Sequence, residues 1–194
     1  MDILIRNGRI ENICLCGTMC EDPADAEIVD CTGKAVLPGF INMHTHAGMS
    51  MMRGVGEDMS FHDWLANIWK IEENIDEEYV YHAVKVACLE MIKTGTTTFN
   101  DQYWHMQMAY KAASELGIRP LLSYVICDRN DQLEAERLKR ECREAYEVSK
   151  SWTGMGVFMV AVHAVYSVSE RAMASSGCSP NLILPVGSSQ KTGA

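Results

Sequence analysis

The most informative stretch of the chain is residues 38–46, which read PGFINMHTH. A short apolar run follows a Pro-Gly pair and ends in His44 and His46. Alternate residues of a β-strand point to the same side, so the two imidazoles should meet near the end of the strand. Two neutral imidazoles in that position make half of a zinc or iron site. The stretch therefore predicts a strand that carries part of a metal centre, against the alternative of a chance His-x-His pair without a metal.

Strands and helices alternate downstream of this stretch. The predicted strands are 40–46, 96–100, 119–127 and 155–165, and the predicted helices begin at Ser60 or span 77–93, 105–116 and 131–150. This order is typical of parallel strands covered by helices. An open doubly wound sheet and a (β/α) barrel both fit it, and a whole barrel needs eight strands and about 250 residues. We expect an α/β fold, a partial TIM-type (β/α) barrel that supplies four of those strands.

A small β-region is expected before the barrel, in residues 1–36. An Asn7-Gly8 pair between two apolar runs is a strong hairpin signal, because both residues tolerate positive φ. The predicted strands of this region are 2–6, 9–13, 26–30 and 34–37.

The two remaining parts of the chain differ in composition and in residue pattern. Residues 37–170 are expected to hold four β/α units of the barrel. Residues 171–194 form an atypical tail rich in Ser, Gly and Pro, where a helix that is signalled at 167–170 soon loses its period. A disordered, flexible tail and a frameshifted gene end both account for this pattern, and we favour the frameshift.

Composition excludes several classes of function. The 194 residues are 47% hydrophobic and 22% charged, which is ordinary for a globular domain with an appendage. A formal net charge of -9 argues against binding to nucleic acid, and no basic cluster indicates an anionic membrane surface. The N-terminus lacks a signal-peptide pattern, and no apolar run approaches the ~20 residues of a membrane span. We expect a soluble, cytoplasmic protein.

The eight cysteines are expected to be free thiols in that compartment. Zinc sites usually draw on cysteine pairs with roughly two to four residues between them, and the Cys14-Leu15-Cys16 spacing is tighter than that. We therefore predict that the N-terminal cluster consists of small buried residues in short strands. Its members are Cys14, Cys16, Cys20 and Cys31.

Four motifs in one order resemble a known family. Residues 30–46 (DCTGKAVLPGFINMHTH) resemble the opening motif of the amidohydrolase superfamily. Residues 51–54 (MMRG), 61–65 (FHDWL) and 95–101 (GTTTFND) resemble the branch that contains adenosine-derivative deaminases and triazine chlorohydrolases. The S-adenosylhomocysteine and methylthioadenosine deaminase type is the nearest within that branch. The resemblance covers roughly residues 1–170.

The resemblance implies roles for particular residues. His44 and His46 match the first two ligands of one divalent metal, with zinc as the first choice and iron as the second. Trp64 matches an aromatic residue that lines the substrate pocket. His163, at the end of the fourth barrel strand, matches a histidine that orients the substrate.

A carboxylate is also implied, and each role has a structural alternative. Glu72, or its neighbour Glu73, matches a carboxylate that can hold ribose hydroxyls. Glu72 could instead be a solvated charge at a helix end. Trp64 lies on the apolar face of its helix and could pack in the core, and His163 could be a buried, hydrogen-bonded histidine.

Other polar residues near the site are expected to have structural roles. Arg53 and Asp58 should fix the long loop after the first strand by an ion pair. Asp101 and His105 follow a strand in a position that faces the site, and hydrogen bonding that holds the structure is the favoured role. The resembled type has an arginine in the third strand where Tyr124 lies here, which argues against a substrate like S-adenosylhomocysteine.

The catalytic set is incomplete by the same resemblance. Residues 157–163 contain no lysine that could bridge two metals, which favours the mononuclear, deaminase-like branch. In that branch a metal makes hydroxide available to attack a ring carbon that bears an amino group, and a glutamate moves a proton to ammonia. The family takes these remaining groups from later strands, but His163 is the last histidine and no aspartate follows residue 131. No catalytic acid or base is assigned, and the chain, which looks truncated, is expected to be inactive unaided.

The chain is thus expected to derive from a hydrolase of C–N bonds other than peptide bonds. The favoured activity is hydrolytic deamination of a small heterocycle, such as an adenosine derivative, a pterin or a guanine-like base. Two other interpretations stay open: a truncated fragment or non-catalytic interaction module, and a cyclic-amide hydrolase, which the missing lysine and the Trp64 loop disfavour. Half a barrel exposes the edges of its first and fourth strands, so a homo-oligomer is also expected.

Overall fold

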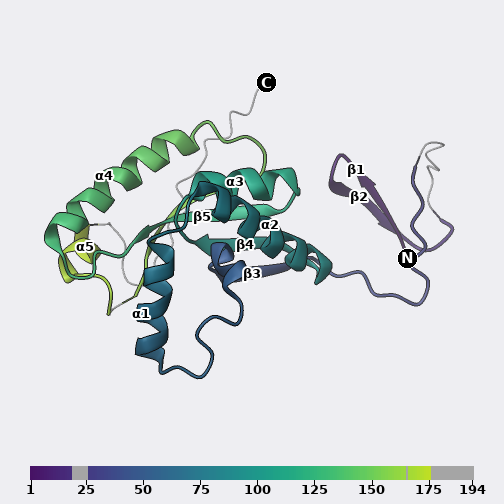
Figure 1. Ribbon diagram of the computed structural model, residues 1–194. Coiled ribbons are helices and arrows are strands. Elements are labelled where there is room, and N and C mark those ends of the chain that lie inside the picture. The colour runs from purple at the N-terminus through teal and green to yellow at the C-terminus, as the bar shows by residue number, and fades with distance from the viewer. Residues whose placement is uncertain (19–25, 165, 176–194) are drawn as a thin grey trace. The chain divides into compact units, whose positions relative to one another are not determined.

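The computed structural model describes residues 1–18, 26–164 and 166–175. The chain divides into two compact units, Met1–Pro38 and Gly39–Ala194 (Figure 1). Each unit has its own sheet.

The small unit is built around one β-hairpin. Strand β1 (Asp2–Arg6) pairs antiparallel with β2 (Arg9–Cys14). Asn7 and Gly8 connect them with φ angles of 52° and 72°, and positive φ at both turn positions is what a tight two-residue hairpin requires. The predicted hairpin is confirmed, with its second strand one residue longer than expected.

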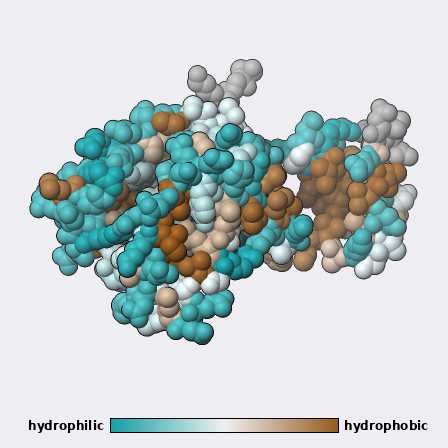
Figure 2. All heavy atoms as spheres, viewed as in Figure 1, coloured by the Kyte–Doolittle hydropathy of each residue, from teal (hydrophilic) through white to brown (hydrophobic). Residues whose placement is uncertain are grey.

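The strands predicted at 26–30 and 34–37 are wrong. The structure describes both stretches, and neither contains a strand. Ile28 and Leu37 are 85% and 72% exposed, so the apolar pattern here has no sheet to pack against within the described part of the chain. Figure 2 shows hydrophobic surface gathered on this unit.

The larger unit contains one parallel sheet with its strands in chain order, β3-β4-β5-β6. In a doubly wound sheet the order reverses at a switch point, whereas in a (β/α) barrel each strand lies beside the one before it. The expected α/β fold, a partial TIM-type barrel, is therefore confirmed. The strands are β3 (Phe40–Thr45), β4 (Thr96–Gln102), β5 (Arg119–Ile126) and β6 (Val157–Val162).

The long helices begin at side-chain caps. Oxygens of Ser60, Asp76 and Asp131 accept hydrogen bonds from backbone N–H groups in the first turn of α1, α2 and α4. The helices agree with the predicted ones to within one residue at the ends that were predicted. They are α1 (Phe61–Glu72), α2 (Glu77–Lys93), α3 (Met106–Glu115) and α4 (Gln132–Ser149), with a 3-10 helix η1 (Ala47–Met52) before them.

The core lies between the sheet and the helices α2 and α3, which pack alongside the strands (Figure 1). Val80 of α2, Phe99 of β4 and Leu122 of β5 are at most 1% exposed. Successive strand residues point to opposite faces, so Gln102 lies on the face opposite Phe99. The helices thus cover one face of the sheet, and the other face is left to form a site.

A short helix follows β6. Helix α5 (Glu170–Ser175) starts where the sequence predicts, with the Ala172 N–H donating to Ser169 Oγ over 3.1 Å. The tail residues 176–194 lie outside the described residues.

The described cysteines are free thiols. The predicted burial is wrong for Cys16 and Cys31, which are exposed because no strand contains them, while Cys20 lies outside the described residues. Across the described ranges no helix is long and apolar enough to cross a membrane.

Candidate active site

A pocket of about 220 Å³ lies at the carboxyl ends of the strands. One wall is the apolar and aromatic face of α1, and the other consists of residues at or just beyond the ends of β3 to β6. In (β/α) barrels this end of the strands is where active sites are built. The lining residues are His46, Met49, Phe61, Trp64, Leu65, Ile68, Trp69, Glu72, Gln102, Tyr103, Trp104, Val125, His163 and Tyr166.

His44 and His46 come together at the end of β3. Their ring centroids lie 4.9 Å apart. His46 Nδ1 is 2.8 Å from the carbonyl oxygen of Gln102. A carbonyl can only accept, so Nδ1 carries a proton, and in the neutral ring the lone pair is then on Nε2. Metal-binding histidines are commonly oriented in this way by a hydrogen bond to the other ring nitrogen. His46 lines the pocket, whereas His44 is exposed beside it.

The donor set does not complete a metal site. Among residues 1–18, 26–164 and 166–175, no group of three or more His, Cys, Asp or Glu side chains lies close enough to hold a metal ion. A catalytic zinc takes three protein ligands and leaves a fourth position open. The chemistry of the His44 and His46 pair suits zinc, but this pair supplies only part of what the metal needs.

His163 faces the same pocket from the end of β6. Its ring centroid lies 6.3 Å from that of His46. Burial, together with the nearby His46 and His44, holds the pKa of His163 below its ordinary value. Its Nδ1 is 2.7 Å from Ser167 Oγ, so a neutral imidazole presents Nε2 to the pocket.

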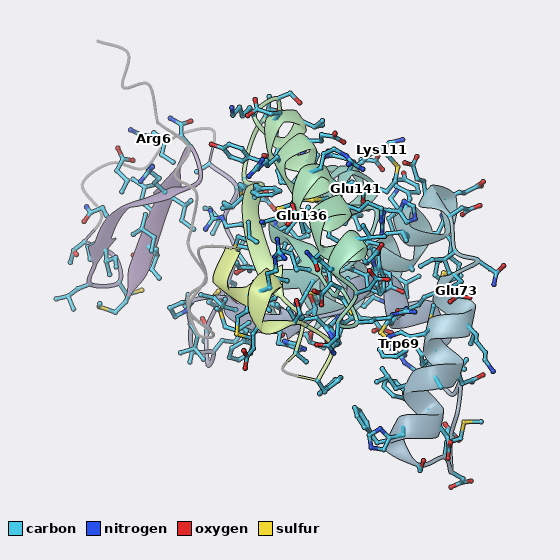
Figure 3. All side chains as sticks on the ribbon, turned by 90° about the vertical axis from the view of Figure 1, so that its left-hand side faces the viewer. Arg6, Trp69, Glu73, Lys111, Glu136 and Glu141 are labelled. Atoms are coloured by element: carbon cyan, nitrogen blue, oxygen red, sulfur yellow. The ribbon has the colours of Figure 1, made fainter. Side chains whose placement is uncertain are left out.

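Glu72 is the carboxylate that enters the pocket, and Glu73 is exposed at the same end of α1 (Figure 3). Burial raises the pKa of Glu72 to about 7, while the Tyr103 hydroxyl and the Arg129 guanidinium act in the opposite direction. The Arg129 guanidinium lies 4.5 Å from the centre of the Trp69 ring. Glu72 therefore changes charge near neutral pH, beside a tyrosine hydroxyl and within the field of an arginine.

Trp64 forms part of the aromatic wall. Its ring stacks on Phe61 with centroids 6.1 Å apart and planes tilted by 27°. A methyl group on Gly56 would lie 2.8 Å from Trp64 Cδ1, so only glycine leaves room for this ring. The wall is thus flat, apolar and suited to a planar ring.

Asp101 has the structural role that the sequence favours. It is 2% exposed and accepts hydrogen bonds from Thr45 Oγ1 at 2.9 Å and from the Ala47 N–H at 2.7 Å. Burial raises its pKa to about 6 in spite of these bonds. Asp101 thereby ties the end of β3 to β4, while His105 is exposed ahead of α3 and is not among the pocket residues.

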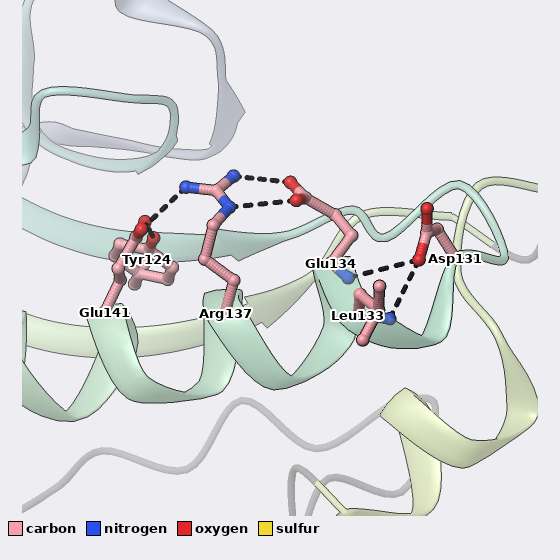
Figure 4. Close-up of polar contacts among 6 residues, drawn as sticks. All are labelled: Tyr124, Asp131, Leu133, Glu134, Arg137 and Glu141. Carbon is pink, nitrogen blue, oxygen red and sulfur yellow. Dashed lines mark hydrogen bonds and ion pairs between the residues drawn. The ribbon is translucent and has the colours of Figure 1, made fainter.

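The expected ion pair of Arg53 is wrong in its partner, and the structure also shows where Tyr124 points. Arg53 fixes its loop through a two-pronged ion pair with Glu90, at 2.8 and 3.0 Å, and not with Asp58. Tyr124 does not face the pocket, because its hydroxyl donates to Glu141 of α4 over 2.7 Å (Figure 4). Arg137 joins the same cluster on the helix side of the sheet.

Several pocket residues were missed by the sequence reasoning, chiefly Gln102, Tyr103, Trp69 and Tyr166. Gln102 and Tyr103 directly follow Asp101, in the position that should face a site. That position after a predicted strand was the signal that could have found them. Adjacent residues of a strand point to opposite faces, so the sequence did not indicate that both side chains line one pocket.

The amino-acid sequence is similar to those of curated deaminases. It is 44% identical to a 5'-deoxyadenosine deaminase of Methanoregula boonei over 151 residues, which are 75% of this chain and 34% of that protein. It is 36% identical to a 5-methylthioadenosine/S-adenosylhomocysteine deaminase of Thermococcus sibiricus over 187 residues, 94% of this chain and 40% of that protein. The chain thus spans between a third and two fifths of the length of these curated relatives.

Solved structures share the fold. A zinc-bound adenosine deaminase from Xanthomonas campestris matches with a TM-score of 0.63 and 27% identity, over 71% of this chain and 32% of that one. Guanine deaminase from C. acetobutylicum matches with a TM-score of 0.60 and 21% identity, over 72% of this chain and 36% of that one, which shows the fold alone. The sequence profile of the Amidohydrolase family matches residues 35–176. The chain therefore belongs to the amidohydrolase family.

Proposed function

We propose that this chain is the part of a metal-dependent deaminase that holds two metal ligands and one wall of the substrate pocket. The observation that carries the proposal is that His46, Trp64 and Glu72 line one pocket. His163 lines it as well, and His44 lies beside it. The substrate class is an aminated heterocycle, with an adenosine derivative favoured over a pterin or a guanine-like base.

The pocket residues suit that substrate. Trp64 offers a flat face on which a heterocycle can stack. Glu72 can accept hydrogen bonds from ribose hydroxyls at the other end of the pocket, and its ionised form does so best. His163 is neutral and offers Nε2 to a ring atom or to a hydroxyl group.

His44 and His46 would hold two ligand positions of one divalent metal, with zinc as the first choice and iron as the second. When bound, such a metal supplies activated water for hydrolysis. The described residues do not complete its coordination, so no reaction step is assigned to this chain. A chain that binds substrate without turning it over is the second candidate function, and the incomplete donor set favours it.

The assembly and location are further parts of the proposal. Strands β3 and β6 are the edges of the sheet, and Phe40 and Met43 on β3 are 62% and 57% exposed. Unpaired edges with apolar side chains promote pairing between copies, so we propose a homo-oligomer. The net charge of -9 argues against binding to nucleic acid, and we propose a cytoplasmic protein whose partners are small molecules.

A combined binding and ammonia assay tests the proposal. Adenosine, 5'-deoxyadenosine, guanine and a pterin are each mixed with the chain and zinc, with tryptophan fluorescence to report binding. Ammonia release that His44→Ala abolishes would establish a deaminase from this chain alone. Adenosine binding without ammonia would assign the chain the substrate-holding role. Absence of both, for every compound, would overturn the proposal.

A further inference from the structure

Gln102 has its main chain in the sheet and its side chain in the pocket. It is the last residue of β4 and pairs with Ser123 of β5. On the other side, its carbonyl oxygen accepts the hydrogen bond from His46 Nδ1, just after β3. Contacts with both neighbouring strands thus fix the backbone, while the side chain lines the pocket. A ligand in the pocket therefore meets a carboxamide that stands on a rigid support.

The amide nitrogen of Gln102 lacks a partner within the described part of the chain. Its Nε2 is shielded from solvent and makes no hydrogen bond there. The Tyr103 hydroxyl is shielded in the same way, but it acts on the Glu72 carboxyl, whose pKa it lowers. Buried polar groups are nearly always paired, because an unpaired one loses the hydrogen bonds that it made to water. A bound ligand that supplies the partner would account for the exception at Gln102.

A carboxamide recognises a particular edge of a heterocycle. It offers N–H donors and an acceptor oxygen side by side in one plane. A half turn of the group exchanges its two ends, so both are available whichever atom lies deeper. Their complement is an acceptor beside a donor, and in nucleic acids glutamine pairs in this way with N7 and the amino group of adenine. A ring nitrogen next to an amino group can therefore make two bonds with Gln102.

Those two bonds distinguish an aminated ring from its oxo counterpart. An oxo group is an acceptor where the amino group is a donor, so the carboxamide oxygen loses its partner. A ring that carries only hydrogen at this position loses the same bond without adding a second acceptor. Leaving a polar group of the site unpaired in this way is what makes a hydrogen-bonding pocket selective. The three rings should therefore bind in the order amino, hydrogen, oxo, with the amino ring tightest.

We infer that Gln102 is a specificity-determining residue, whose carboxamide pairs with the amino group and the neighbouring ring nitrogen of an aminated heterocycle. The pocket then prefers the aminated ring to the oxo ring that deamination would leave. This ligand assignment rests on the proposed function, which names the substrate class. The unpaired amide nitrogen does not, because it is present in the chain without a ligand.

Thermal unfolding of the full chain without ligand tests the unpaired amide. Gln102→Leu replaces the carboxamide with an apolar group of similar size, so the melting temperature should stay the same or rise. Gln132→Leu, at the exposed start of α4, is the matched control and should change it little. A clear fall in Gln102→Leu alone would overturn the inference, because it would show that the carboxamide already bonds within the chain.

Calorimetric titration with adenosine, inosine and purine riboside, without added metal, tests the pairing. Adenosine should bind the unmodified chain roughly 5-fold to 150-fold more tightly than inosine, which is the range that one two-bond pair gives. Gln102→Leu should bring these affinities together, mainly by weakening adenosine. Gln102→Glu should weaken all three ribosides yet keep adenosine ahead, because a carboxylate still accepts from the amino group. Gln132→Leu should leave all three affinities unchanged.

The outcomes separate this inference from the proposed function. A preference for adenosine over inosine that survives in Gln102→Leu would overturn the role of Gln102 and leave the proposed function standing. Equal binding of all three ribosides by the unmodified chain would do the same. If the unmodified chain bound none of them, the proposed function would be overturned, and with it the ligand assigned to Gln102.

Discussion

Tyr103 fills the space over Gly48 so closely that a methyl group on Gly48 would lie 2.1 Å from the tyrosine ring. Tyr103 is 4% exposed and belongs to the core that supports the pocket. Gly48→Ala should therefore push the ring aside and destabilise the fold by about 1–3 kcal/mol, as overpacked cores do. Urea unfolding followed by fluorescence measures the change. In a Tyr103→Ala background the same Gly48→Ala change should cost far less, and an equal cost in both backgrounds would show that the contact is not the cause.

Glu72 should make the stability of the chain depend on pH. Its folded-state pKa is about 7, raised from 4.5 mainly by burial, so between these values the folded chain binds more protons than the unfolded chain. Stability should therefore fall as pH rises from 4.5 through 7. Glu72→Gln removes the titration and should stabilise the chain at pH 8 but not at pH 4. Solvent at the pocket mouth screens the effect, which we expect to be about 1 kcal/mol.

Melting temperatures of the two proteins at several pH values measure this difference. Glu73→Gln is the matched control, because Glu73 is exposed next to Glu72. A pH profile that Glu72→Gln leaves unchanged would contradict the burial of this carboxyl group.

Arg129 should hold down the pKa of Glu72. The guanidinium lowers this pKa by its positive charge and lies over the Trp69 ring. Arg129→Met keeps an apolar contact with the ring and removes the charge, so the pKa of Glu72 should rise above its present value of about 7. Carbon NMR of the glutamate carboxyl groups measures it. The exposed Arg143 on α4 provides a control, since Arg143→Met should leave the Glu72 titration where it is.

Zinc should bind this chain weakly and through two histidines. His44 and His46 have rings 4.9 Å apart, but the described residues supply no third ligand. Calorimetry should show weak zinc binding that His44→Ala abolishes, whereas His82→Ala, on the exposed face of α2, should have no effect. Tight, stoichiometric zinc that survives His44→Ala would mean that the metal binds elsewhere.

The helices and strands of the larger unit were predicted well because the sequence signals for them are local. Ser60 and Asp131 cap helices whose first turns follow directly after them. The β-branched run before Asn100 likewise indicates a strand at its own position. The pairing of Arg53 with Glu90 spans 37 positions, and no local pattern carries such information. The apolar alternation at 26–30 failed for a related reason, since a strand needs a partner as well as a pattern.

The candidate site was predictable in part for the same reason. His44 and His46 are related by the two-residue period of a strand, so their convergence follows from local geometry. The predicted strand ended at Asn100, so Gln102, which is the last residue of β4, was left outside its period, and Tyr103 lies beyond the strand, where no period applies. The direction of the Tyr124 side chain was not predicted, because the place of a residue along a strand does not say which face it takes until the register of the whole strand is known.

The hydrogen bond that orients His46 ends on a main-chain oxygen of Gln102. Every amino acid supplies that oxygen, so no point substitution at position 102 can delete the acceptor. The side chain of Gln102 meanwhile lines the pocket. Mutation at this one position can therefore alter what the pocket prefers while the histidine stays in place. The ligand preference of the pocket and the orientation of His46 therefore depend on different atoms of the same residue.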